Sequence, residues 1–141
     1  MVLLTSSALL PLSGAYKKRG LTLTTQNLTA VLNEARLRSM SGEMLSQPTT
    51  LRYGISFQTD RFIFFAGDTY DSANTSNIEN KLDNNLTFSE IGFPGNEVVF
   101  DKVTGEVWNF NADSNYVVLT EGTTNQSKTI LINKYGAIDV Q

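Results

Sequence analysis

Residues 15–45, AYKKRGLTLTTQNLTAVLNEARLRSMSGEML, are predicted to form one long amphipathic helix against which the rest of the chain packs. Leu21 opens an apolar stripe on this helix, and Ser39 and Met40 extend it at the other end. Gly42 then supplies a stop, because glycine readily takes the left-handed conformation that closes a helix. The centre of the stripe has the i, i+3, i+4, i+7 spacing of one helical face, at Leu28, Val31, Leu32 and Ala35.

The first half of this stretch carries a second pattern. Residues 20–25 alternate apolar and polar side chains, as a strand does, and threonine is a poor helix former. Gly20 would cost about 1 kcal/mol inside a helix relative to alanine. On propensity alone, a short strand could occupy residues 20–25, with the helix beginning at a Thr25 or Asn27 cap. We expect the continuous helix and keep the strand as the alternative.

The composition excludes several kinds of chemistry. The 141 residues are 40% hydrophobic, which suits a single globular domain with a core. The chain has no cysteine and no histidine, so disulfides, zinc or iron sites with nitrogen or sulfur ligands, and histidine-based triads are excluded. The formal net charge of −3 provides no overall basic field for nucleic acid.

The N-terminal stretch, residues 1–12, reads MVLLTSSALLPL and is apolar. It is shorter than the roughly 20 apolar residues that a membrane-spanning helix needs. It could be a weak signal peptide, the buried start of a helix, or the end of a membrane helix whose beginning is missing. Residues 16–19, YKKR, follow at once and resemble the aromatic and basic belt of a membrane boundary, although a solvated basic patch is the alternative.

From residue 51 onward, the chain consists of short β-type runs separated by turns. Thr59 and Asp60 form a tight turn that predicts a hairpin, and residues 101–105 form a hairpin loop with Gly105 at positive φ. We expect about seven strands, drawn mainly from residues 51–57, 61–67, 86–91, 98–100, 116–119 and 128–133, with residues 107–110 leading out of the hairpin loop and residues 137–140 as a terminal segment. Because the helix and strands are segregated along the sequence, the fold class is α+β, with one long N-terminal helix packed against antiparallel sheet.

The polar residues 68–85 are predicted to form a long surface loop, with one helical turn at most. Ile78 and Leu82 are its only apolar anchors. Calcium could bind to the oxygen-bearing side chains of this loop: Asp68, Asp71, Asn74, Asn77 and Glu79. Their spacing does not match a known calcium loop, so a solvated loop is the favoured interpretation.

Three aromatic side chains lie close together in the sequence: Trp108, Phe110 and Tyr116. They could form a platform for a ligand, but packing in the core or between sheets is the favoured interpretation. No pair of carboxylates stands out for acid–base chemistry, and Gly-rich phosphate loops are missing. We therefore expect neither an enzyme nor a bound cofactor or metal.

Five runs of residues carry a resemblance to a known family. They are NEARLRSMSGE at 33–43, RYGISF at 52–57, FAGDTY at 65–70, VVFDKVTGE at 98–106 and KTILINKYG at 128–136. In this order they resemble the GspH/FimT-type minor pseudopilins, which are related to type IV pilins and to the pseudopilins of type II secretion. No single run is diagnostic, but together they cover nearly the whole chain.

The resemblance implies a pilin-like fold with an N-terminal helix at 1–45 and a globular β domain at 46–141. Residues 1–14 would be the remainder of the membrane and filament-core segment, and Pro11 stands where the family has a helix kink. The peptidase site and the glutamate expected near the mature N-terminus are absent. We therefore interpret the chain as an N-terminally truncated member.

The same resemblance implies a mechanical function. The protein would be a non-enzymatic minor subunit of a type IV pilus or type II secretion filament, and its partners would be other pilin or pseudopilin subunits. A full-length form would also contact the inner membrane through its N-terminal segment. The residues that pack in the filament and the membrane would be Leu3, Leu4, Leu9, Leu10, Pro11 and Leu12. The helix would be held to its own sheet by Leu28, Val31, Leu32, Ala35 and Met40.

The expected location is the bacterial inner membrane and periplasm or a cell-surface filament. The alternative function is a surface binding module, either adhesin-like or a DNA-uptake pilin. Some members of the family bind DNA through a basic C-terminal region. Residues 134–141 here contain one base and one acid, which argues against nucleic acid as a partner.

Overall fold

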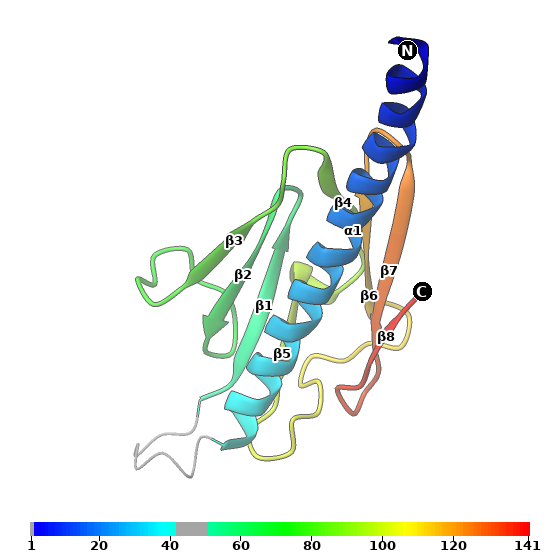
Figure 1. Cartoon of the computed structure of the whole chain (residues 1–141). Helices are drawn as coiled ribbons and strands as arrows, with labels where there is room; N and C mark the ends of the chain where they lie inside the picture. The colour runs from blue at the N-terminus through cyan, green and yellow to red at the C-terminus, as the bar shows by residue number, and fades with distance from the viewer. Residues whose placement is uncertain (1, 42–50) are drawn as a thin grey trace.

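The computed structural model describes residues 2–41 and 51–141, with only the backbone described for residues 2–18. One helix, α1 (Val2–Ser41), precedes eight strands in the described chain (Figure 1). The strands are β1 (Tyr53–Gln58), β2 (Arg61–Ala66), β3 (Ile78–Lys81), β4 (Leu86–Ile91), β5 (Glu97–Phe100), β6 (Tyr116–Glu121), β7 (Gln126–Ile132) and β8 (Ile138–Val140), with a short 3₁₀ turn at Pro94–Asn96.

The strands form two antiparallel sheets of four strands each. The first has the order β3-β2-β1-β5 and the second has the order β4-β6-β7-β8. From Arg19 onward, α1 lies over both sheets and contacts β1, β5, β6 and β7 (Figure 1). The predicted α+β class with a single helix is therefore confirmed, and the strand count is one higher than expected. Residues 107–110 do not form a strand, because only Val107 pairs there, in an isolated bridge to Phe100.

The continuous helix is also confirmed, and the alternative strand at residues 20–25 is wrong. Burial accounts for this result, because one face of the helix is covered by the sheets from Leu21 onward. The hydroxyls of Thr25 and Thr29 donate to carbonyls one turn earlier, so these threonines satisfy their polar groups within the helix. Tertiary packing thus overrides the weak propensity. Ser41 is the last helical residue described, and residues 42–45 of the predicted helix lie outside the described residues.

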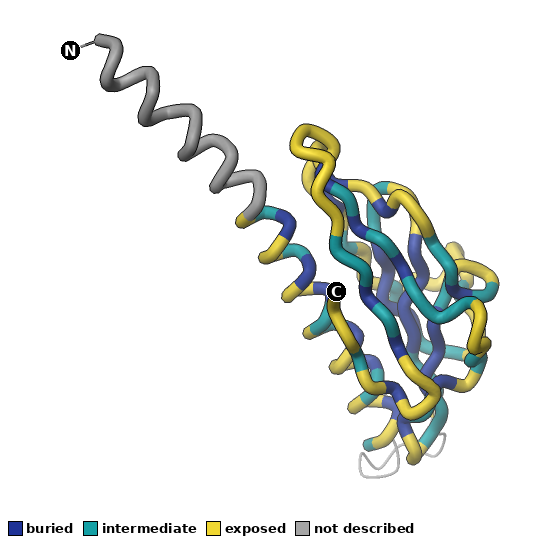
Figure 2. The backbone as a smooth tube through the Cα atoms, turned by 90° about the vertical axis from the view of Figure 1, so that its right-hand side faces the viewer, coloured by how far each residue is buried: buried dark blue, intermediate teal, exposed yellow. Residues whose placement is uncertain are grey.

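The core fills the space between α1 and the inner faces of both sheets. Its largest members are phenylalanines: Phe57 of β1 stacks on Phe93 and meets Phe88 edge-on, with ring centroids 5.3 Å apart in both pairs. Figure 2 shows the buried positions recurring along α1 and through the strands of both sheets. The helix and the two sheets therefore share a single hydrophobic cluster.

The predicted loop at 68–85 needs correction, because it contains β3. This four-residue strand pairs with β2 and places Ile78 at the surface, where it is 54% exposed. Leu82 is buried, as expected of an anchor. The preceding segment is held to β5 by Glu97, whose carboxylate accepts hydrogen bonds from the Thr69 hydroxyl (2.8 Å) and the Tyr70 amide (2.9 Å).

This segment covers the outer face of the first sheet. The Tyr70 ring lies 5.9 Å from the ring of Phe65, which is buried together with Ile63 and Val99. Phe65 also lies against Gly54, where an added Cβ would come within 2.8 Å of the ring. The unbroken runs of buried residues in β1 and β2 therefore reflect a sheet that is covered on both faces.

Candidate functional site

The candidate site is α1 with the surfaces beside it, because the expected function depends on this helix. Its sheet-facing residues confirm most of the predicted set. Leu28, Leu32 and Ala35 have no exposed surface, and Val31 is half-buried against the same cluster. Met40 does not belong to the core, because it is 36% exposed and its sulfur lies where a Cβ on Gly105 would come within 2.7 Å. Its side chain instead packs on the loop of residues 101–105, at the edge of the β domain.

The opposite side of α1 carries exposed apolar residues at a spacing of seven. Leu23 is 57% exposed and Leu37 is 60% exposed, with the exposed Ala30 midway between them. Residues seven apart lie on nearly the same side of a helix. The sequence continues this spacing upstream with Tyr16 and Leu9. The predicted filament residues Leu3, Leu4, Leu9, Leu10, Pro11 and Leu12 lie in the part of α1 whose side chains are outside the described residues.

Ser39 fixes the C-terminal end of α1. Its buried hydroxyl donates to the Ala35 carbonyl (2.9 Å) and accepts a hydrogen bond from the Tyr53 amide at the start of β1 (3.0 Å). Its carbonyl accepts a further bond from the Val103 amide at 3.1 Å. One residue therefore joins the helix both to the first strand and to the 101–105 loop.

Arg36 ties the same end of the helix to the second sheet. Its Nε donates to the Gly105 carbonyl at 3.3 Å. Gly136, in the turn after β7, packs so closely that an added Cβ would lie 2.6 Å from that carbonyl and 2.8 Å from Arg36 Nε. Both glycines have positive φ, 68° and 84°, so the prediction for Gly105 is confirmed. The runs at 33–43, 98–106 and 128–136 that carry the family resemblance thus meet at one junction.

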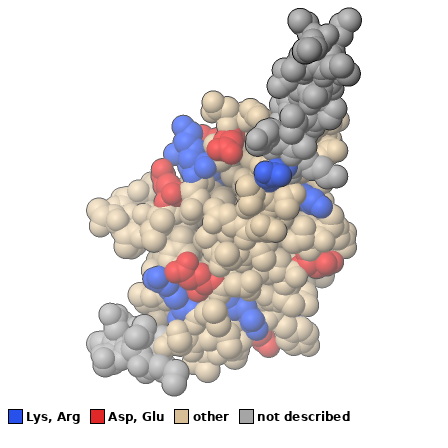
Figure 3. Space-filling view, in the orientation of Figure 1, with Lys and Arg blue, Asp and Glu red and all other residues tan. Residues whose placement is uncertain are grey.

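Several charged side chains of the described residues are paired locally. Figure 3 shows basic and acidic groups side by side on the visible face. Arg52 bonds Asp68 at 2.8 Å and Asp101 at 3.0 Å, and it lies 4.3 Å over the ring of Trp108. The hydrogen bond to Asp68 is the largest cause of the raised pKa of Arg52.

Most of the oxygen atoms considered for calcium have other partners; the exception is Asn77 Oδ1, which is buried and has no hydrogen-bond partner among the described residues. Asp68 binds Arg52, Asp71 accepts a hydrogen bond from the Ala73 amide, and Asn74 accepts one from the Ser76 amide. Asn77 donates to the Asp71 carbonyl. Within residues 19–41 and 51–141, no three acidic side chains cluster closely enough to suggest a metal site.

The three aromatic residues considered as a platform have separate surroundings. Trp108 is 47% exposed beneath Arg52, whereas Phe110 packs against the core. The Tyr116 hydroxyl donates to the Glu90 carboxylate, and this bond raises the pKa of the tyrosine. Core packing, the favoured interpretation, therefore holds for Phe110 alone.

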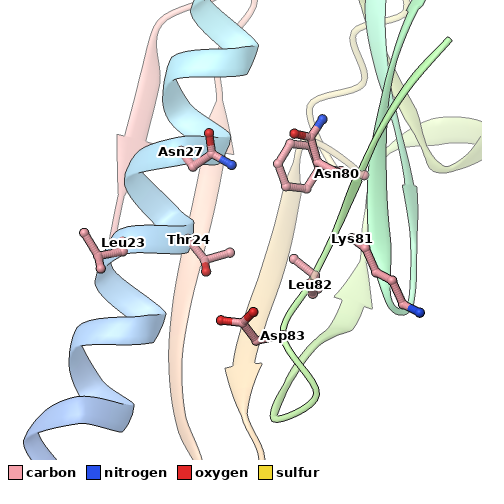
Figure 4. A pocket seen from close by; sticks show the side chains of 8 residues that line it. Leu23, Thr24, Asn27, Asn80, Lys81, Leu82 and Asp83 are labelled. Carbon is pink, nitrogen blue, oxygen red and sulfur yellow. The ribbon is translucent and has the colours of Figure 1, made fainter.

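At least three grooves lie beside the described part of α1, and the smallest of these, of about 290 Å³, lies between Leu21 and Thr22 of the helix and residues 126–128. The other two are larger. One, of about 430 Å³, separates the helix from β3, and Figure 4 shows Asn27 of the helix and Asn80 of the strand facing each other across it. The other, of about 390 Å³, lies against Lys128 and Val140 and is walled by Thr22, Thr25, Gln26 and Thr29 of the helix. The sequence did not indicate either groove, because each joins segments far apart in the chain.

The class of protein that these features define is an α+β domain with one helix packed on two antiparallel sheets, an arrangement compatible with a pilin-like fold. Comparison with known proteins adds no identification: no family profile, no curated protein and no solved structure matches the chain. Within its described residues, α1 contains no apolar stretch long enough to cross a bilayer.

Proposed function

We propose that this protein is a non-enzymatic minor pilin or pseudopilin, a subunit of a type IV pilus or type II secretion filament that assembles through its N-terminal helix. Its partners would be other pilin-like subunits, and a longer form would also meet the inner membrane. The corresponding location is the bacterial inner membrane and periplasm or a cell-surface filament.

The supporting observation is the mismatch in length between α1 and the sheets. At about 1.5 Å per residue, the 40 residues of α1 make a rod of about 60 Å. The longest strand, β7, has seven residues and spans about 23 Å at roughly 3.3 Å per residue. Figure 1 shows the N-terminal part of α1 continuing past the ends of both sheets. The helix α1 is therefore longer than the β domain needs to complete its hydrophobic core.

The sequence of the protruding part favours burial by neighbouring helices. The segment that contains Leu9, Leu10 and Leu12 is apolar, and exposure to water costs roughly 25 cal/mol per Å² of apolar surface. Leu23 and Leu37 are already exposed on the described part of the helix. Packing of parallel α1 helices at a filament axis would cover both sets, with the β domain left outside.

The proposal is tested in cells that produce this chain together with a set of minor pilins or pseudopilins as candidate partners. We expect the full chain to co-purify with them after crosslinking, and the double variant Leu9→Asp, Leu12→Asp to lose this association. Ser72→Asp, an exposed loop change that adds one similar charge, is the control and should behave as wild type. Undiminished co-purification of the double variant would show that the N-terminal helix is not part of the assembly surface.

A further inference from the structure

The groove between α1 and β3 has the construction of a small-ligand site. Its floor is apolar, from Phe62 and Leu82, which are both buried. Its rim is polar, and Figure 4 shows the Asp83 carboxylate on the helix side of the loop that follows β3. The volume of about 430 Å³ lies within the range of pockets that hold small molecules. The polar side chains along the rim are Thr24, Asn27, Asn80 and Asp83.

Two side-chain amides face each other across this groove without internal partners. Neither Asn27 nor Asn80 makes a side-chain hydrogen bond to another described residue. Each amide offers two N–H donors and one carbonyl acceptor. A ligand between them must therefore both donate and accept hydrogen bonds.

The main chain around the groove limits how an extended peptide could bind there. The Leu82 amide donates to the Asp60 carbonyl at 2.8 Å, and Asn80 lies opposite Phe62 in the same ladder. In an antiparallel pair these main-chain groups alternate, so those of Asn80 and Leu82 face β2. The free groups, those of Glu79 and Lys81, point outward in the plane of the sheet. No main-chain ladder is thus available inside the groove.

The charges around the groove also restrict the ligand. Asp83 brings a negative charge to the rim, whereas the Lys81 side chain runs away from the groove in Figure 4. An anion such as phosphate would lack the positively charged donors that normally bind it. A neutral ligand with hydroxyl groups meets both conditions, since each hydroxyl donates and accepts.

We propose that this groove binds a neutral saccharide of one or two rings. Its hydroxyls would bond the facing amides of Asn27 and Asn80 and the carboxylate of Asp83. This site adjoins the helix packing proposed above, because Leu23 belongs both to the exposed stripe and to the groove lining, and it would give the β domain a recognition function of its own.

The test is an NMR titration of the ¹⁵N-labelled full chain with glucose, galactose, N-acetylglucosamine and lactose. We expect at least one of these sugars to shift the side-chain NH₂ signals of Asn27 and Asn80 along a saturable curve. Inorganic phosphate should leave these signals unchanged. Binding of phosphate in preference to every sugar would overturn the proposed ligand class, and absence of a saturable shift with all four sugars would overturn the site.

Three variants locate the binding. Asn80→Ala and the nearly isosteric Asn27→Asp, which exchanges two donors for an acceptor, should each raise the dissociation constant at least tenfold. Asn33→Ala, an exposed asparagine on α1 outside the groove lining, is the matched control and should leave it unchanged. Thermal unfolding checks that each variant is folded. Equal affinity in all three variants would place the sugar elsewhere and contradict the proposal.

Discussion

Glu121 is a carboxylate with almost no exposed surface, and its partners belong to the turn that follows it. It accepts hydrogen bonds from the Thr124 hydroxyl and amide, both at 2.6 Å, and from the Thr123 amide at 3.1 Å. The Thr124 hydroxyl contributes most to lowering the pKa of Glu121 to about 2, against an ordinary value of 4.5. The ionised form thus closes the turn between β6 and β7.

This arrangement predicts a pH dependence of stability. A carboxyl with a lowered folded-state pKa stabilises the fold above its unfolded pKa, and that contribution is lost as the pH falls through the folded value. For Glu121 the window runs from about 4.5 down to about 2. Thermal unfolding should therefore show wild type losing its advantage over Glu121→Gln within this window. Parallel pH curves for the two proteins would contradict the assignment.

Ser39 allows a second prediction at the scale of one residue. Ser39→Ala removes the acceptor of the Tyr53 amide and leaves that N–H without its partner. An unsatisfied buried group costs about 1–3 kcal/mol, so the free energy of unfolding should fall by that amount. Urea titration measures it, with the exposed Ser72→Ala as a control expected to change by less than about 0.5 kcal/mol. A loss no larger than that of the control would mean that water replaces the hydroxyl.

Within α1, Gly20 is a position at which a substitution can increase the stability of the helix. The residue is helical, and a Cβ added there would meet no atom within 4 Å. Gly20→Ala should therefore raise the free energy of unfolding by about 1 kcal/mol, since glycine costs that much in a helix. Chemical denaturation measures the change.

Gly54→Ala in β1 is the matched comparison and should act in the opposite direction, because its Cβ would lie 2.5 Å from the Val98 carbonyl oxygen. Equal effects of the two substitutions would mean that neither reflects its local surroundings.

Elements with a strong pattern were predictable from sequence, and those held by pairing alone were not. The β1–β2 hairpin follows from alternating apolar residues around Thr59 and Asp60, and its register agrees, with Gln58 opposite Arg61. β3 has mostly exposed side chains and is a strand because β2 offers it backbone partners. The sequence also did not predict the conformation of Val103. This residue has a positive φ of 68° at the centre of a tight turn, where a β-branched residue is rare.

The candidate site was predictable only in part, for a similar reason. The buried stripe of α1 follows from spacing within one segment, so Leu28, Leu32 and Ala35 were correctly assigned to the core. Ser39, four residues after Ala35, continues the buried stripe, whereas the neighbouring Met40 packs against Gly105 instead. The pairing of Asn27 with Asn80 depends on how α1 crosses the first sheet, which no local pattern encodes.

At the scale of the whole molecule, α1 and the two sheets share one hydrophobic cluster, so we expect the two sheets to unfold together. Leu32 is fully buried in the cluster shared by the helix and both sheets. Leu32→Ala should lower the free energy of unfolding by about 2–5 kcal/mol, the usual cost of such a cavity. Trp108 fluorescence and far-UV circular dichroism should still report coincident transitions. Separate midpoints would show that the sheets are independent units.

The firm packing of α1 on both sheets affects how the proposed sugar site would be presented by an assembled filament. Because Ser39 and Arg36 clamp the helix, the head cannot swivel around it, and the groove at Asn27 keeps a fixed angle to the helix axis. A row of aligned copies would therefore present one sugar site per copy at regular intervals. A polysaccharide spanning several sites would be held by avidity, so even a weak individual site could give durable attachment.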